Sequence, residues 1–243
     1  MSYEAFARVY DQLTFNVDYA GYASFIHTCL LAHNVRDGLV LDAACGTGSI
    51  DVFLRELGYD MILADDSRDM LMEASAKVPG ALLLCQSMTA LDLYGTVRAC
   101  ICTLDSVNHL PSARDVRAFF EKVSLFTEPG GVFIFDVNTP YKHREILGNR
   151  TFIYDLPDVY CVWQNHYEET DHAVGIALDF FVNADGKYTR YHDSFREIAH
   201  EPDTVSALLR DTGFKDVTIC VDLDGTRFDG RDCERLYFCA TKE

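Results

Sequence analysis

An acid and two glycines near the start of the chain are the residues whose types and spacing most clearly indicate chemistry. Asp42 ends an apolar segment, and Gly46 and Gly48 follow it in a turn of small residues, within the stretch LVLDAACGTGSI. An amphipathic segment with apolar residues at helical spacing comes next and stops at Gly58. This pattern predicts a strand, a tight turn and a helix. Small residues let the backbone approach a ligand, and the helix start offers free N–H groups and a positive dipole end.

A second acid stands where a ribose is bound in many strand–helix–strand units. Asp65 follows the next apolar segment, residues 59–64, and lies 19 residues after Gly46. At this spacing an acidic residue at the tip of the neighbouring parallel strand meets the ribose hydroxyls. Ser67 can cap the helix that we expect over residues 68–77. The two strand tips together predict a site for a nucleoside.

The turn does not match the pattern that binds a dinucleotide. That pattern, G-x-G-x-x-G, needs a third glycine at the position of Asp51. A carboxylate just inside the helix would face a pyrophosphate badly, so the turn fits a ligand without a diphosphate better. A nicotinamide-dependent oxidoreductase is therefore only a distant alternative.

The stretch D-x-A-C-G-T-G, residues 42–48, resembles motif I of the class I S-adenosylmethionine-dependent methyltransferases. The stretches YEAFARVYDQL and DSVNHL resemble a bacterial small-molecule subset of that family, which is methyltransferase domain 25-like and amino-sugar N-methyltransferase-like. The resemblance implies S-adenosyl-L-methionine as the cofactor. It also implies a set of cofactor contacts: Tyr10, Asp42, Ala44, Gly46, Gly48, Asp65, Asp66, Met70, Ser87, Met88 and Asp105.

Some of these positions have a structural interpretation as well. Tyr10 either closes over the cofactor or packs as a plain apolar residue, and Met70 either packs on the adenine or belongs to a helix core. Family members often carry Asp at position 87, where Ser87 offers a hydroxyl without charge. The resemblance places Asp105 opposite the methionine ammonium of the cofactor.

His109 is the residue that we select for catalysis. It replaces a more usual Tyr in the stretch DSVNHL. An imidazole can act as a base near neutral pH, although a lone His at a helix start is more often a hydrogen-bonding or capping residue. His143 and His192 are further candidates for the base. We expect no metal ion.

From about residue 150 to residue 197 the pattern becomes aromatic and alternating, and Asp185 and Gly186 form a two-residue hairpin signal. We predict three or four antiparallel strands, inserted between the fifth strand and the last helix, that serve as a lid or as a wall for the acceptor. A dimer interface or a supporting sheet is the alternative. The candidates for contact with the acceptor are Trp163, Tyr188, Arg190 and His192.

The order of the expected elements, with the resemblance, predicts an α/β fold of the Rossmann-like class I methyltransferase type. The resemblance implies a seven-stranded, mostly parallel sheet with an antiparallel last strand and helices on both faces, plus a small inserted antiparallel β-sheet. Residues 1–149 and 198–243 would form the cofactor-binding domain, and residues 150–197 would form the inserted lid or substrate subdomain.

The composition limits the partners and the compartment. The chain has 243 residues, enough for one sizeable domain with an insertion. Its 38 acidic and 21 basic residues give a net charge of -17, which disfavours binding to nucleic acid or to anionic membranes. Nine cysteines without a C-x-x-C pair, no signal-peptide pattern and no long apolar run predict a cytoplasmic protein.

These features predict an enzyme that transfers the sulfonium methyl group of S-adenosylmethionine to an N, O or C atom of a small-molecule acceptor. The alternative is a non-catalytic module that binds S-adenosylmethionine and uses its insertion to bind a partner protein. The sequence does not define the acceptor, and it leaves both a monomer and a homodimer open.

Overall fold

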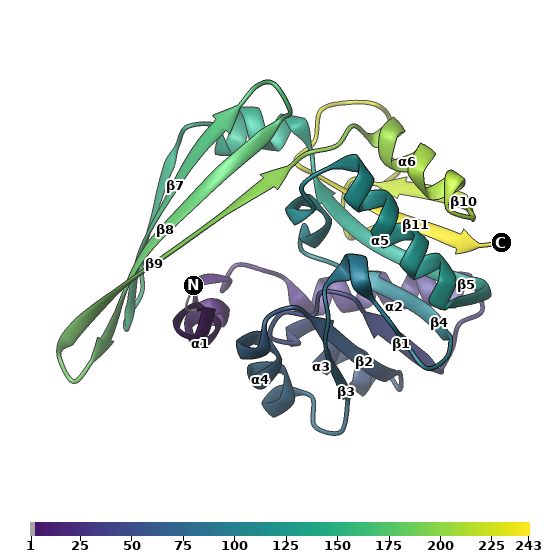
Figure 1. Ribbon diagram of the computed structural model, residues 1–243, viewed down its shortest axis with the longest axis horizontal. Coiled ribbons are helices and arrows are strands. Elements are labelled where there is room, and N and C mark those ends of the chain that lie inside the picture. The colour runs from purple at the N-terminus through teal and green to yellow at the C-terminus, as the bar shows by residue number, and fades with distance from the viewer. Residues whose placement is uncertain (1–2) are drawn as a thin grey trace.

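The chain folds around a seven-stranded sheet with the strand order β10-β11-β5-β4-β1-β2-β3 (Figure 1). The computed structural model describes residues 3–243. Strands β1 to β5 run parallel, and β11 runs antiparallel to both of its neighbours, β5 and β10. The predicted fold class is confirmed, with its antiparallel last strand. The strands are β1 (Leu39–Asp42), β2 (Asp60–Asp65), β3 (Leu82–Cys85), β4 (Val97–Cys102), β5 (Thr127–Asn138), β10 (Phe214–Cys220) and β11 (Arg235–Lys242).

Helices cover both faces of this sheet, which is why its central strands are nearly continuous apolar runs. On one face lie α2 (Tyr19–Ala32), α3 (Ser49–Glu56) and α4 (Arg68–Lys77), and on the other lie α5 (Ala113–Phe126) and α6 (Pro202–Asp211). A cluster of buried rings joins α5 to β5 and β11, and each buried phenylalanine stabilises the fold by roughly 1.5–3 kcal/mol. The rings belong to Phe119, Phe120, Phe133, Phe135 and Phe238.

The parallel order brings the carboxyl ends of β1, β2 and β4 to one edge of the sheet, with β1 in the middle. Asp42 is the last residue of β1 and Asp65 is the last residue of β2. Asp105 follows shortly after the end of β4. Open α/β sheets bind their ligands at this edge, so the fold gathers the acids that the sequence analysis selected.

A side-chain cap explains where α4 begins. The Ser67 hydroxyl accepts a hydrogen bond from the Met70 N–H at 3.3 Å, which confirms the predicted cap of α4. Three short helices complete this part of the chain: η1 (Met88–Ala90), η2 (Ser106–His109) and the π-helix η3 (Lys142–Leu147). Of these, η2 carries His109 just beyond the end of β4.

The insertion forms a separate four-stranded antiparallel sheet with the order β6-β7-β8-β9, as predicted. It projects from the larger sheet as a long, twisted ribbon (Figure 1). Asp185 and Gly186 both have positive φ, +53° and +76°, and they form the hairpin turn between β8 and β9 that the sequence predicts. The strands are β6 (Thr151–Asp155), β7 (Val159–Glu168), β8 (Ala173–Ala184) and β9 (Lys187–Ile198).

The N-terminal helix α1 (Tyr3–Leu13) lies between the two sheets (Figure 1). Its Phe6 ring packs against Phe180 of β8 at 5.9 Å between centroids, and Val9 joins the same apolar cluster. One face of the inserted sheet is therefore covered by α1. The limits of the two proposed domains stay a prediction. Across residues 3–243, none of the helices combines the length and the apolar character that crossing a membrane requires.

Candidate active site

The two glycines of the first turn have different tasks. Both adopt positive φ, +53° for Gly46 and +73° for Gly48. A Cβ atom on Gly48 would lie 3.2 Å from side-chain atoms of Ala74 and Val78, so this glycine lets α4 pack against the turn. A Cβ atom on Gly46 would meet nothing within 4 Å, so this glycine faces open space. Gly46 is thus the position at which a ligand can approach the backbone.

Asp65 lies beside this turn and is held by backbone donors. Its Oδ2 accepts from the Gly46 N–H at 2.9 Å, and its Oδ1 accepts from the Ser67 N–H at 2.8 Å. Burial raises the pKa of Asp65, and the two N–H donors oppose that shift. Each carboxylate oxygen keeps a further lone pair for an acceptor bond. The geometry therefore fits a ribose at Asp65, while Asp66 is exposed next to it.

A buried pair of carboxyl groups supports the turn from below. Asp42 is 2% exposed and accepts from the Ala44 N–H at 3.2 Å, and Asp51 is fully buried beside it. Burial raises the pKa of Asp51 to about 7 and raises that of Asp42 as well. Two buried carboxylates repel each other, so the pair retains a proton up to about pH 7. Asp51 therefore faces Asp42 and not a ligand, because the first turn of α3 directs it inward.

Helix α1 closes over the turn through contacts that the sequence analysis did not identify. Asp11 accepts hydrogen bonds from the hydroxyls of Thr47 at 2.7 Å and Ser49 at 3.2 Å, and it pairs with Lys77 of α4. Tyr10 lies beside Asp11 on α1. The sequence indicated Tyr10 and not Asp11, because the partners of Asp11 come from distant segments.

Tyr10 lies near the tips of both β2 and β4. Burial raises the pKa of its hydroxyl above the usual value, and the charges of Asp105 and Asp65 add to the shift. Because both acids act on the same hydroxyl, Tyr10 lies within the electrostatic reach of both strand ends. This position agrees with a residue that closes over a ligand, and the closing role stays a prediction.

The residues expected around the adenine occupy the end of β3 and the start of α4. Met70 is buried at 7% exposure, Met88 is half-buried, and Ser87 is exposed, with its hydroxyl 3.3 Å from that of Thr89. The Cys102 thiol lies 3.7 Å from the Met88 sulfur, so Met88 packs against the end of β4. These placements are compatible with an adenine site, and they leave the individual contacts as predictions.

The end of β4 is fixed by a buried acid on β5. Leu104 and Asp105 both have φ of +56°, and their N–H groups donate to the two oxygens of Asp136 at 2.7 and 3.0 Å. Arg235 of β11 pairs with Asp136 and donates to Asp105 at 2.6 Å. Burial alone would raise the pKa of Asp105, but the charges of Arg235 and Lys142 lower it overall. Arg235 therefore bonds to Asp105 Oδ1, and Oδ2 can accept from a ligand.

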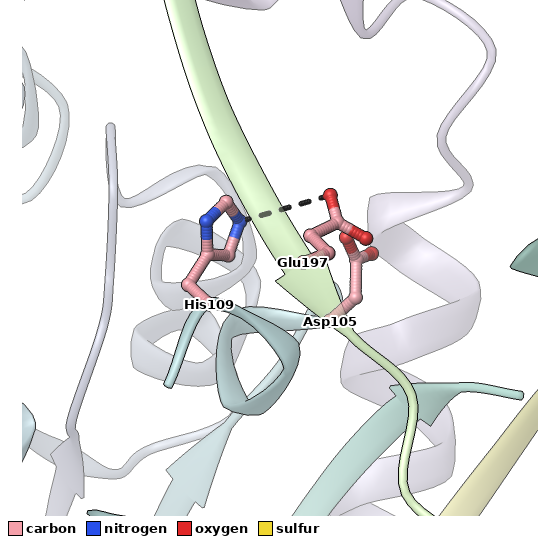
Figure 2. Close-up of side chains that lie close together, drawn as sticks. All are labelled: Asp105, His109 and Glu197. Carbon is pink, nitrogen blue, oxygen red and sulfur yellow. Dashed lines mark ion pairs between the residues drawn. The ribbon is translucent and has the colours of Figure 1, made fainter. Parts of the chain in front are cut away.

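His109 meets an acid that comes from the insertion (Figure 2). Its Nε2 lies 4.0 Å from Glu197 Oε1, and its ring lies 5.1 Å from the ring of Phe195 on the same strand, β9. The other oxygen of Glu197 accepts from Asn138 Nδ2 at 3.1 Å and lies 3.4 Å from His143 Nε2. Glu197 is thus held from behind, with Oε1 directed at His109. Nothing in the sequence pattern links Glu197 to His109, because the two residues belong to different parts of the chain.

Asp105, His109 and Glu197 together offer two carboxylate oxygens and an imidazole nitrogen within 4.8 Å of one another. Such a group can hold a divalent cation. The cation Arg235 already neutralises Asp105, and Lys142 lies close enough to lower its pKa further. The expectation of no metal ion stays a prediction.

The structure does not bring the four expected acceptor contacts together. Trp163 lies on the covered face of the inserted sheet, where its Nε1 donates to Asn165 at 2.7 Å. Arg190 and His192 lie on the opposite face, and both contact Asp179 Oδ1, at 2.7 and 3.2 Å. Tyr188, which is 59% exposed, shares their face because side chains alternate along β9. The acceptor role of each residue stays a prediction.

The comparisons with known proteins agree with this arrangement. A family model described as a methyltransferase domain matches residues 40–131. YqeM of Bacillus subtilis, provisionally named a methyltransferase, is 30% identical over 246 residues, which cover 100% of this chain and 98% of YqeM. The crystal structure of an S-adenosylmethionine-dependent methyltransferase from Clostridium acetobutylicum matches with a TM-score of 0.89 and 29% identity, and the match covers 100% of this chain and 99% of that one.

A more distant relative acts on a sugar amine. The dTDP-3-amino-3,4,6-trideoxy-alpha-D-glucopyranose N,N-dimethyltransferase of Streptomyces venezuelae is 32% identical over 118 residues, which cover 48% of this chain and 49% of that protein. Together with the fold and the strand-tip geometry, the matches show that the chain belongs to the class I S-adenosylmethionine-dependent methyltransferases. The resemblance found in the sequence is confirmed.

Proposed function

We propose that this methyltransferase transfers the methyl group of S-adenosylmethionine to the nitrogen of a small-molecule amine. The observation that carries the proposal is the contact between His109 and Glu197, which places a base and its supporting carboxylate next to Asp105 at the ligand edge of the sheet. The name of the Streptomyces venezuelae relative supports a nitrogen acceptor in a related chain.

The cofactor contacts in this proposal are those of the strand tips. Gly46 leaves room for the ligand, Asp65 accepts the ribose hydroxyls, and Tyr10 covers them from α1. Ala44 and Gly48 shape the turn, and Asp42 holds it through the Ala44 N–H. We assign the adenine end to Asp66, Met70, Ser87 and Met88, and the free oxygen of Asp105 to the methionine ammonium.

An amine attacks only through an unprotonated nitrogen. When bound, S-adenosylmethionine supplies a methyl group that is already activated by its sulfonium. His109 accepts the proton from the acceptor ammonium, and Glu197 stabilises the positive charge that this proton brings to the imidazole. The rest of the task is alignment, which can supply roughly 7–11 kcal/mol of the barrier. No step in this proposal requires a metal ion, so we expect transfer to persist in the presence of a chelator.

We also propose that the inserted sheet forms the wall of the acceptor site, with Trp163 on its covered face. Its other face, with Tyr188, Arg190 and His192, either contacts the acceptor at the rim of the site or faces a second copy of the chain. The protein would work in the cytoplasm as a monomer or a homodimer, on small molecules and not on nucleic acid or membranes.

The proposal is tested by measuring S-adenosylhomocysteine release with a panel of amines, amino sugars, alcohols and carboxylic acids. We expect turnover with an amine, a loss of turnover in His109→Ala, and wild-type binding of S-adenosylhomocysteine in that variant. The control is Glu201→Gln, since Glu201 is an exposed carboxylate that pairs with His172 at 3.9 Å, whereas the carboxylate beside His109 is Glu197. Turnover with an alcohol or an acid and with no amine would contradict a nitrogen acceptor.

A further inference from the structure

Three cysteines line a cavity between α2 and the last two strands of the large sheet. The cavity has a volume of about 410 Å³ and lies between α2, β10, β11 and the loop that joins the two strands. Its lining includes Cys29, Cys220, Cys239 and the cation Arg227. Asp42, Asp65, Asp105 and His109 are not among the residues that line this cavity. The methyl transfer that we propose makes no use of these thiols.

Cys29 and Cys239 form an unequal pair. Cys29 is half-buried on α2, and Cys239 is 3% exposed on β11. Both thiols line the same cavity as Arg227. The interaction of Cys29 with Cys239 and the charge of Arg227 lower the pKa of Cys29 against the effect of burial. The interaction with Cys29 and burial raise the pKa of Cys239. Cys29 is therefore the member that carries thiolate character, and thiolate character and access decide which cysteine an oxidant attacks.

The third thiol of the cavity is already occupied. The Cys220 S–H donates to the carbonyl oxygen of Gly225 at 3.5 Å, and burial raises its pKa. Cys220 is also buried, at 5% exposure. It is therefore a poorer nucleophile than Cys29. It is also a poorer partner than Cys239, because its S–H is directed at Gly225.

We propose that Cys29 and Cys239 form an oxidation site, in which hydrogen peroxide oxidises Cys29 to a sulfenic acid and Cys239 converts it to an intramolecular disulfide. In the first step the Cys29 thiolate attacks one peroxide oxygen, the O–O bond breaks, and hydroxide leaves. In the second step the S–S bond forms, the S–O bond breaks, and the hydroxyl leaves with the Cys239 proton as water. Cys29 and Cys239 together lose two electrons, and peroxide is reduced.

This chemistry suits a protein with free thiols in a reducing compartment, where disulfides are transient and report an oxidant. The disulfide would join α2 to β11 and close a loop that contains most of the chain. Because a cross-link over a long loop restricts the unfolded state, the oxidised protein should resist unfolding better than the reduced one. The proposal does not depend on the identity of the acceptor.

The test is to treat the full-length protein with hydrogen peroxide and to map its cysteines by mass spectrometry without reduction. We expect a peptide pair joined through Cys29 and Cys239. In Cys239→Ser, dimedone should label Cys29, because the sulfenic acid has no partner. Cys85→Ser is the matched control, since Cys85 is exposed and bonds only weakly to the Asp66 carbonyl, at 3.6 Å.

A second measurement avoids any dependence on the variants. The Tm of the wild-type protein should shift upward after peroxide treatment and return after dithiothreitol, and Cys239→Ser should show no upward shift. The proposal is wrong if peroxide oxidises Cys85 while Cys29 and Cys239 stay reduced, or if Cys29 becomes linked to Cys220.

Discussion

The ligand edge of the large sheet and the inserted sheet position their side chains in different ways. At the ligand edge, backbone N–H groups hold the functional acids: Gly46 donates to Asp65, and Leu104 and Asp105 donate to Asp136. In the inserted sheet, side chains alternate between two faces of a ribbon, and no backbone group fixes any of the expected acceptor contacts. Local backbone geometry therefore fixes the side chains at the ligand edge. In the insertion, the surroundings of each side chain depend on which segment covers its face.

This difference suggests a division between cofactor binding at the sheet edge and acceptor chemistry at the junction with the insertion. In our proposal the turn and the strand tips serve the cofactor, which is the same throughout a family, and short stretches of chain are sufficient to build them. The insertion reaches this edge near the end of β9, where Glu197 contacts His109 and Asn138 and Phe195 packs against the His109 ring. The acceptor chemistry that we propose depends on that junction, so its residues come from both regions.

The largest expected effect is at the turn. Gly46→Val forces a β-branched residue to φ of +53° and places its side chain in the space that we assign to the cofactor. We expect calorimetry to detect no binding of S-adenosylhomocysteine. Gly58→Val is the matched control, because Gly58 has φ of +96° and equally open surroundings but lies just beyond the C-terminal end of α3, at the opposite end of that helix from the turn. Equal binding by the Gly46 variant and the control would show that the turn does not hold the cofactor.

The next effect is at the junction of the two regions. His109→Ala should lower the rate of methyl transfer by about 10²- to 10⁴-fold, the usual contribution of a general base. Glu197→Gln should cost less. Because Glu197 acts through His109, the double variant should be no slower than His109→Ala alone. Steady-state rates at saturating cofactor test this, and additive losses would mean that Glu197 works independently.

Asp65→Ala should weaken cofactor binding by about 10²- to 10⁴-fold, because the two charge-assisted hydrogen bonds that we assign to the ribose contribute roughly 1.5–3 kcal/mol each. The variant also leaves the Gly46 and Ser67 N–H groups without their acceptor. Asp60→Ala is the control, since Asp60 is exposed at the opposite end of β2. Titration calorimetry with S-adenosylhomocysteine distinguishes them, and similar affinities in the two variants would exclude a ribose contact at Asp65.

The same contrast explains what the sequence could predict. The turn, Asp65 and the Asp105 stretch lie within or directly after strands, so their spacing along the chain defined their places at one edge. The helices and strands followed from hydrophobic periodicity and caps such as Ser67, and the insertion followed from its alternating pattern. In these elements local sequence and tertiary structure agree.

The missed residues are those whose role depends on contacts between distant segments. Asp11 bonds to the glycine turn, Arg235 joins Asp105 to Asp136, and Glu197 reaches His109. Each looks like an ordinary surface charge in the sequence. Strand alternation correctly indicated a sheet, but it could not indicate which face α1 would cover, so Trp163 and Arg190 were grouped although they lie on opposite faces.

The buried acids under the glycine turn should also make the free energy of unfolding depend on pH. Asp51 has a pKa raised to about 7 by burial, so the native state holds a proton that the unfolded chain releases near pH 4. This contribution to the free energy of unfolding is complete below about pH 4 and is lost as the pH rises through about 7. Asp51→Asn should remove that loss, because the amide carries no charge at any pH. We expect the Tm of the variant minus that of the wild type to increase between pH 5 and pH 8 by a few degrees. A constant difference would show that the pair does not share a proton.

The smallest effect is expected on the exposed face of the insertion. Arg190 is 63% exposed in its pair with Asp179, and an exposed pair of this kind contributes roughly 0–1 kcal/mol. Arg190→Ala should therefore leave the Tm almost unchanged. The KM for the acceptor tests which face of the inserted sheet contacts the acceptor. We expect Arg190→Ala to change this KM less than twofold. Trp163→Phe, on the covered face, should raise it several-fold. A larger increase in KM for Arg190→Ala would move the acceptor site to the outer face and would leave the cofactor edge as it is.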